Sequence, residues 1–184
     1  MVARDEHGIQ RRVTGAHDLR LDGIGDLLSR ARGARVLDVG CNRGMAGYEF
    51  AVNGAALVHG CDHYAKGIET AREIFADIRN VASRFEVVDL SAPGAFAEVF
   101  GPERYDIVLL LAVFHKLKRV MVAQALDALI ADLGDRTDRY VGWRGYAEEI
   151  PELDAIFARC GLTRIHTSEI SETICPAAIW RRNS

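Results

Sequence analysis

A chain of 184 residues with 49% hydrophobic and 27% charged residues has the composition of one folded globular domain rather than of a disordered segment. A formal net charge of -3 argues against a dedicated nucleic-acid-binding protein, because neutralising phosphates requires a basic face. No stretch approaches the ~20 apolar residues of a membrane span, and the amino-terminal residues lack the apolar run of a secretory signal, so a cytoplasmic protein is expected.

The cysteines of the chain show no pattern that would bind a metal. Cys41, Cys61, Cys160 and Cys175 lie in apolar surroundings, without a C-x-x-C pair and without histidines at ligand spacing. The sequence therefore predicts reduced thiols in the core and no metal site.

Apolar periodicity predicts a single domain, 1–184, made of an amino-terminal helical segment, 1–33, and a core sheet region, 34–184. A helix is predicted over 17–31, where apolar residues recur at helical spacing. Strands and helices then alternate, with strands predicted over 35–39, 56–61, 84–88, 105–111 and 139–141 and helices over 45–52, 64–78, 95–100 and 117–133. Such alternation predicts a parallel sheet that is covered on both faces and connected by right-handed crossovers.

The end of the chain follows a different pattern. A helix is predicted over 151–160, since Pro151 suits a first helical turn and Gly161 a position just past the end. Two strands, 163–169 and 174–181, are joined by a link too short for a parallel crossover, so they form a hairpin. The sequence thus predicts an α/β fold with a doubly wound, mostly parallel seven-stranded sheet whose last strand is antiparallel.

A glycine-containing turn closes the first core strand. Ligands of open α/β sheets bind at the carboxyl ends of the strands, and here the segment from Val36 to Gly44 reads V-L-D-V-G-C-N-R-G. It resembles the first motif, D/E-x-G-x-G-x-G, of class I S-adenosylmethionine-dependent methyltransferases, with Asn42 in place of the middle glycine. Asparagine accepts a left-handed backbone better than most residues. Judged alone, the segment is also compatible with an ordinary turn between a strand and a helix.

The resemblance implies a Rossmann-like methyltransferase fold that binds S-adenosyl-L-methionine and releases S-adenosyl-L-homocysteine. It implies that Asp38 binds the ammonium group of the cofactor, directly or through water, and Arg20 is our choice for its carboxylate. Glycines lack a Cβ, so the backbone can pass close to the methionine part of the cofactor. The residues expected there are Gly40, Cys41, Asn42 and Gly44.

Acidic residues also end the second and third strands. In the family, the acidic residue at the position of Asp62 accepts both ribose hydroxyls, and the aspartate at the position of Asp89 lies near the adenine amino group. The remaining cofactor contacts expected from the resemblance are His63, Leu90 and Ala112. Each carboxylate alone is more often a helix cap than a ligand, but three of them at successive strand ends favour a cofactor.

A histidine follows the fourth predicted strand. The segment from Asp106 to Leu117 resembles the strand, turn and helix start of small bacterial methyltransferases, including enzymes that act on polysaccharide ends, in which this segment lies beside the reactive methyl group. An imidazole near its free pKa of about 6.5 can take a proton from a hydroxyl at neutral pH. His115 is therefore the candidate general base, with capping or packing of the turn as the alternative.

Basic and aromatic residues near the same edge suggest the acceptor. The candidate substrate-binding residues are Lys116, Trp143, Arg144 and Tyr146, although Trp143 is equally compatible with core packing. Arg11 and Arg12 precede the first core strand and are expected to fold over the cleft, as the family's amino-terminal segment does. Guanidinium groups bind phosphate and carboxylate through paired hydrogen bonds. A small-molecule or saccharide- or phosphate-terminal acceptor, with an anionic group, is expected.

Two other functions remain compatible with the pattern. A non-catalytic S-adenosylmethionine-binding protein would keep the same carboxylates and glycines without turnover. A nicotinamide-dependent oxidoreductase would require G-x-G-x-x-G, and this chain has Asn42 and Met45 at the second and third glycine positions. Acceptor pockets are built from variable loops, so the sequence pattern predicts the reaction and not the acceptor or the oligomeric state.

Overall fold

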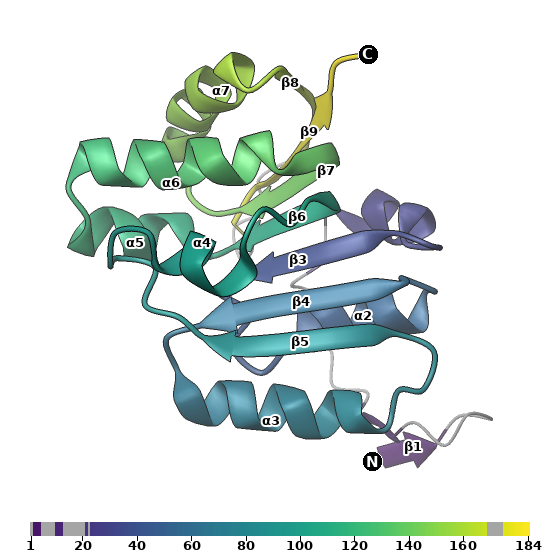
Figure 1. Ribbon diagram of the computed structural model, residues 1–184. Helices are drawn as coiled ribbons and strands as arrows, with labels where there is room; N and C mark the ends of the chain where they lie inside the picture. The colour runs from purple at the N-terminus through teal and green to yellow at the C-terminus, as the bar shows by residue number, and fades with distance from the viewer. Residues whose placement is uncertain (1, 5–9, 13–20, 22, 169–174) are drawn as a thin grey trace.

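The computed structural model describes residues 2–4, 10–12, 21, 23–168 and 175–184, and its larger sheet has the strand order β5-β4-β3-β6-β7-β9-β8 (Figure 1). Strands β3 to β7 are parallel, and β9 is antiparallel to both β7 and β8. The predicted doubly wound sheet with an antiparallel last strand is confirmed. The strands are β3 (Arg35–Val39), β4 (Leu57–Asp62), β5 (Ala82–Val87), β6 (Tyr105–Leu111), β7 (Thr137–Arg144), β8 (Leu162–Thr167) and β9 (Ala177–Arg182).

Helices cover both faces of this sheet, each over its own apolar cluster. One face packs against η1 (Gly25–Arg30), α2 (Met45–Val52) and α3 (Ala65–Ala76), and the other against α4 (Ala95–Phe100), α5 (Phe114–Val120), α6 (Ala123–Asp135) and α7 (Ile150–Arg159). Successive residues of β3 alternate between the clusters, since Leu37 and Val39 belong to one and Val36 to the other. Burial on both faces explains why these strands are continuous apolar runs in the sequence.

The helix predicted over 117–133 is wrong, because the structure has two helices there. α5 ends at Val120, α6 begins at Ala123, and the backbone between them is extended, with ψ of 147° at Met121 and 146° at Val122. β-branched residues such as Val120 and Val122 lower helix propensity slightly. The apolar spacing continues across the break, so periodicity alone could not locate it.

The amino-terminal segment also differs from the prediction of a helical segment over 1–33. β1 (Val2–Arg4) pairs antiparallel with β2 (Gln10–Arg12), and η1 is a 3₁₀ helix rather than an α-helix. Residues 17–20 and 22 of the helix predicted over 17–31 lie outside the described residues, and Leu21 is helical. The N-cap residue of η1 is Ile24, and no side-chain hydrogen bond caps this helix. The residue before it, Gly23, has a left-handed backbone with φ +79°.

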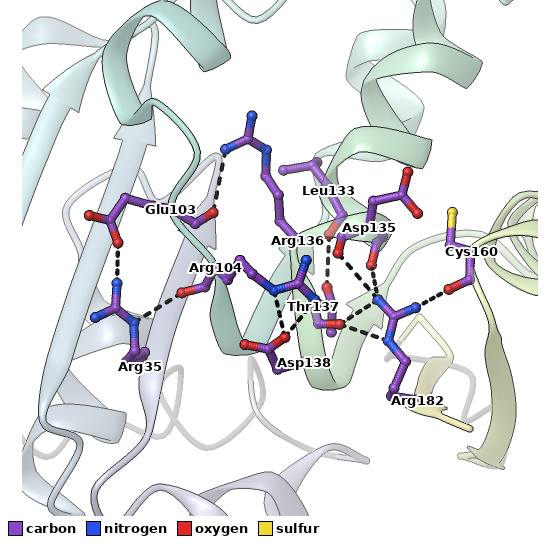
Figure 2. Close-up of polar contacts among 11 residues, drawn as sticks. Arg35, Glu103, Arg104, Leu133, Asp135, Arg136, Thr137, Asp138, Cys160 and Arg182 are labelled. Carbon is purple, nitrogen blue, oxygen red and sulfur yellow. Dashed lines mark hydrogen bonds and ion pairs between the residues drawn. The ribbon is translucent and has the colours of Figure 1, made fainter. Parts of the chain in front are cut away.

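Arginines close the amino edge of the sheet, where β3, β6 and β7 begin (Figure 2). The Arg182 guanidinium donates from Nε to the Thr137 carbonyl at 2.9 Å and also to the Cys160 carbonyl. Arg104 donates to Asp138 at 2.8 Å, and Arg35 pairs with Glu103. Because these side chains fill the amino edge of the sheet, the opposite edge, formed by the carboxyl ends of the parallel strands, remains for a ligand.

Two further observations concern the cysteines and the helices. Cys41, Cys61 and Cys160 are buried, as predicted, but Cys175 is exposed, so it is not a core thiol. None of the helices in the described part of the chain is long and apolar enough to cross a bilayer.

Candidate active site

The turn after β3 has a left-handed backbone at three positions. Gly40, Asn42 and Gly44 have φ of +72°, +51° and +71°, which asparagine and glycine tolerate better than other residues. A Cβ on Gly40 would lie 2.7 Å from Cγ2 of Val113, and a Cβ on Gly44 would lie 2.9 Å from Cβ of Ala71. These glycines therefore allow the side chains of Val113 and Ala71 to pack closely on the turn. From the sequence, the glycines were expected to make room only for the cofactor.

Asp62 joins this turn to the end of β4. Its Oδ2 accepts the backbone N–H of Asn42 at 2.9 Å, and its Oδ1 accepts that of Tyr64, also at 2.9 Å. The exposed imidazole of His63 lies 3.3 Å from Oδ1. Asp62 is only 8% exposed. A carboxylate offers about four acceptor positions, so Asp62 can hold the turn and still accept hydrogen bonds from a ligand.

Asp38 and Asp89 flank Asp62 but differ in burial. Asp38 is buried, and its Oδ2 accepts the N–H of Gly47 in the first turns of α2 at 3.3 Å. Asp89 is exposed, and its Oδ1 accepts both the N–H of Ser91 at 3.0 Å and the hydroxyl of Ser91 at 2.6 Å, which lowers the pKa of Asp89. Three acceptor groups at successive strand ends fit a ligand that carries an ammonium, two hydroxyls and an amino group.

Cys41 and Leu90 are buried beside these carboxylates. Burial, followed by the charge of Asp38, raises the pKa of the Cys41 thiol. The thiol is therefore neutral at physiological pH and contributes shape rather than a nucleophile. Across residues 21, 23–168 and 175–184, no group of three or more histidine, cysteine or acidic side chains is placed to hold a metal ion.

The ends of β6 and β7 form the other half of the site. Ala112, just past β6, has φ +55° and donates its N–H to the Arg144 carbonyl at 2.8 Å. The ring of His115, at the start of α5, packs edge-on against Tyr146, with centroids 5.0 Å apart. Burial, followed by the charges of Lys116 and Arg119, lowers the pKa of His115. His115 is therefore a neutral imidazole at pH 7.

The predicted acceptor residues are not equally accessible. Lys116 is exposed and Tyr146 is 42% exposed, whereas Arg144 is only 9% exposed. Trp143 is fully buried and packs edge-on against Trp180 at 6.2 Å, so it belongs to the core between the sheet and α7. The prediction that Trp143 forms a wall of the acceptor pocket is therefore wrong.

Arg11 and Arg12 belong to β2, which pairs antiparallel with β1. Figure 1 shows β1 on the side of the sheet where β3, β4 and β5 begin. That Arg11 and Arg12 fold over the cleft stays a prediction. Arg20 lies outside the described residues.

The structure adds one residue that the sequence pattern did not indicate. Glu149, at the end of η2 (Ala147–Glu149), is 3% exposed, and its Oε2 accepts the N–H of Tyr146 at 3.3 Å. Burial, followed by the charge of Glu148, raises the pKa of Glu149. An acidic run before Pro151 is typical of an exposed helix start, so the sequence offered no signal that one of its members is buried.

Part of this chain matches a known protein family. The profile of a family described as "Methyltransferase domain" matches residues 36–133, just over half of the chain. A ubiquinone biosynthesis O-methyltransferase from Neisseria meningitidis serogroup C (strain 053442) is 42% identical over 78 residues, which are 42% of this chain and 32% of that protein. The match thus spans about a third of the length of that relative.

Solved structures show the same fold at low sequence identity. Magnesium protoporphyrin IX methyltransferase from Synechocystis PCC 6803, with bound SAM, has a TM-score of 0.68 and 21% identity, covering 92% of this chain and 81% of that one. The bifunctional kinase-methyltransferase WbdD has a TM-score of 0.65 and 24% identity, covering 92% and 39%. The similarity to these two structures shows a shared fold. The segment that matches the family profile contains the glycine turn, Asp62, Asp89 and His115. The chain therefore belongs to the methyltransferase-domain family.

Proposed function

We propose that this chain transfers a methyl group from S-adenosylmethionine to a hydroxyl of a small-molecule acceptor. The observation that supports this most is the set of three carboxylates at the ends of β3, β4 and β5, with a neutral histidine beyond the next strand, β6. When bound, the cofactor supplies a methyl group on a sulfonium, which is a good leaving group. The protein then has to align the acceptor and, for a hydroxyl, accept its proton.

The three carboxylates are the residues that would hold the cofactor. Asp62 has free acceptor positions for the two ribose hydroxyls, since each of its oxygens already accepts one backbone N–H. Asp89 is exposed and has a lowered pKa, so it is an ionised acceptor for the adenine amino group. Asp38 is the residue for the ammonium group. Gly40, Cys41, Asn42, Gly44, His63, Leu90 and Ala112 complete the proposed cofactor contacts.

His115 is the proposed general base. Its Nδ1 is buried and has no hydrogen-bond partner within the described residues, so Nε2 is the ring nitrogen that meets an acceptor. A lowered pKa keeps the ring neutral at pH 7 and able to take the hydroxyl proton as the oxygen attacks. The name of the Neisseria relative, an O-methyltransferase, supports a hydroxyl as the acceptor group.

Lys116 and Tyr146 are the proposed acceptor contacts. Both are accessible, and both lie beside His115, Lys116 in the chain and Tyr146 through ring packing. The ammonium of Lys116 suits a carboxylate or phosphate near the reacting hydroxyl, and the Tyr146 ring offers an apolar surface. Arg144 is mostly buried. It therefore contributes positive charge and a backbone hydrogen bond to the site, and it does not bind the acceptor directly.

Calorimetry with S-adenosylhomocysteine, followed by turnover assays on phenols, saccharides and their phosphorylated or carboxylated forms, tests the proposal. We expect cofactor binding, and turnover only with hydroxyl acceptors, best with an anionic neighbour. Lys116→Ala should raise KM for that acceptor and reduce its dependence on salt, since screening shortens from ~10 Å at 0.1 M to ~3 Å at 1 M. Binding without turnover of any acceptor would indicate a non-catalytic binding protein, and preference for NAD an oxidoreductase.

A further inference from the structure

Glu149 is a buried carboxylate without an ion-pair partner among the described residues. It is 3% exposed, and Lys118, whose positive charge acts on it, forms its ion pair with Glu152. Burial of an ionised carboxylate is costly unless it is paired or hydrogen-bonded. The hydrogen bond that the structure gives Glu149 is the one from the Tyr146 N–H.

The surroundings of Glu149 leave it little freedom. A Cβ on Gly145 would overlap both Oε2 of Glu149 and the ring of Trp143, whose Cζ2 would be 2.5 Å away. Gly145 has no side chain, so the carboxylate can pack directly on the backbone of the turn that follows β7. The carboxylate and the buried Trp143 ring therefore both pack against the backbone of this turn at Gly145.

Tyr146 connects that turn to His115. Its backbone N–H binds Glu149, while its ring packs edge-on against the His115 ring at 5.0 Å with an interplanar angle of 64°. Part of the burial that lowers the pKa of His115 is thus provided by a ring whose backbone is held by Glu149. Beside this contact, Lys118 of α5 binds Glu152 of α7, so α5 contacts both the turn before η2 and the start of α7.

We propose that Glu149 is a positioning residue for His115, acting through the backbone and ring of Tyr146. This inference rests on the proposed function only for the role of His115 in the reaction. Without the carboxylate, the turn loses its hydrogen bond and the Tyr146 ring no longer has a fixed place. The His115 ring then becomes more hydrated, which relieves the burial that disfavours its charged form.

The test is an NMR titration of His115 in the full chain, with four variants. Glu149→Ala should raise the His115 pKa toward that of a free histidine, whereas Glu149→Gln, whose amide oxygen still accepts the Tyr146 N–H, should change it less. Tyr146→Ala should raise it in the same direction, and the double variant should show no further rise. Glu148→Ala is the matched control, because it removes a neighbouring exposed carboxylate and should leave the His115 pKa near the wild-type value.

Turnover provides a second readout. A displaced base should lower kcat roughly ten- to a hundred-fold in Glu149→Ala, with the dissociation constant of S-adenosylhomocysteine unchanged. A folded Glu149→Ala protein with the wild-type His115 pKa would refute the inference, as would additive effects of the Glu149 and Tyr146 substitutions. Failure of this inference can be distinguished from failure of the proposed function. The titration is measured without cofactor or acceptor, so it tests the inference even if no acceptor is turned over.

Discussion

The carboxylate of Asp62 accepts the backbone N–H of Asn42 at 2.9 Å, and this bond joins the end of β4 to the turn after β3. Its other oxygen holds Tyr64, the residue before α3. A residue proposed to bind the ribose is therefore also part of the frame of the site. Removing its side chain is therefore expected to change the shape of the turn as well as the affinity for a ligand.

Asp62 and Asp89 should respond differently to the same substitution. Asp62→Asn is expected to lower both thermal stability and cofactor affinity, because the amide nitrogen cannot accept one of the two backbone N–H groups. Asp89→Asn should lower affinity alone, since Asp89 is exposed. A charged hydrogen bond contributes roughly 1.5 to 3 kcal/mol, or about ten- to a hundred-fold in affinity. Calorimetry with S-adenosylhomocysteine and thermal unfolding measure the two effects, and unchanged affinity in both variants would refute the cofactor assignment.

The pH dependence of kcat should report the lowered pKa of His115. A base must be neutral to accept a proton, so activity is full above the pKa of His115 and falls as pH decreases through it. Because that pKa lies below the ordinary value of 6.5, the acid limb should lie below pH 6.5. His115→Gln should lower kcat by about 10² to 10⁴ and remove this limb. Wild-type turnover in the variant would mean that His115 is structural.

Arg182 should contribute much more stability than its neighbour in sequence. Arg182→Met removes the donors to the carbonyls of Thr137, Gly134 and Cys160, so these part-buried acceptors lose hydrogen bonds. We expect a loss of roughly 3 kcal/mol, or about 6 to 12 °C in Tm for a domain of this size. Arg181→Met, at an exposed position of the same strand, is the control. Equal Tm values for the two variants would contradict the role given to Arg182.

Gly40 and Gly33 offer a matched pair for the turn after β3. Both have φ of +72°, but only at Gly40 would a Cβ meet a neighbour, at 2.7 Å from Val113 Cγ2. Each substitution to alanine should cost about 1 to 2 kcal/mol for the left-handed backbone, and Gly40→Ala should cost clearly more. Denaturant unfolding measures the difference. The double variant Gly40→Ala/Val113→Ala should lose less than the sum of the single variants, and strict additivity would count against crowding.

The predicted helices and strands match the structure where the local pattern of apolar residues corresponds to the residues that are buried. β3, α2, α4 and β6 match their predicted ranges, because an apolar run buried on both faces or a short apolar helix is bounded there by glycine or polar residues. The break between α5 and α6 was not predicted, since the apolar spacing that marks a helix continues through Met121 and Val122. Local patterns also do not distinguish a buried indole from one at a pocket wall, as at Trp143.

The candidate site residues that the sequence indicates are those that lie at the ends of successive strands. Asp38, Asp62, Asp89 and His115 come one after another at strand ends, so the sheet alone brings them to one edge. Glu149 was missed because its burial depends on a turn packing against Gly145 and on the position of α5, both of which are tertiary contacts.

The place of β9 in the sheet has a consequence for biosynthesis. β9 is the last strand in the chain but lies between β7 and β8, and it is antiparallel to both. During translation β7 and β8 therefore emerge with no partner between them, and the edge of β7 stays open until Arg182 has left the ribosome. Unpaired strand edges promote association with other chains. A nascent chain that stalls before this point would expose that edge beside an otherwise formed parallel sheet, so the synthesis of β9 is expected to close an edge at which nascent chains could associate.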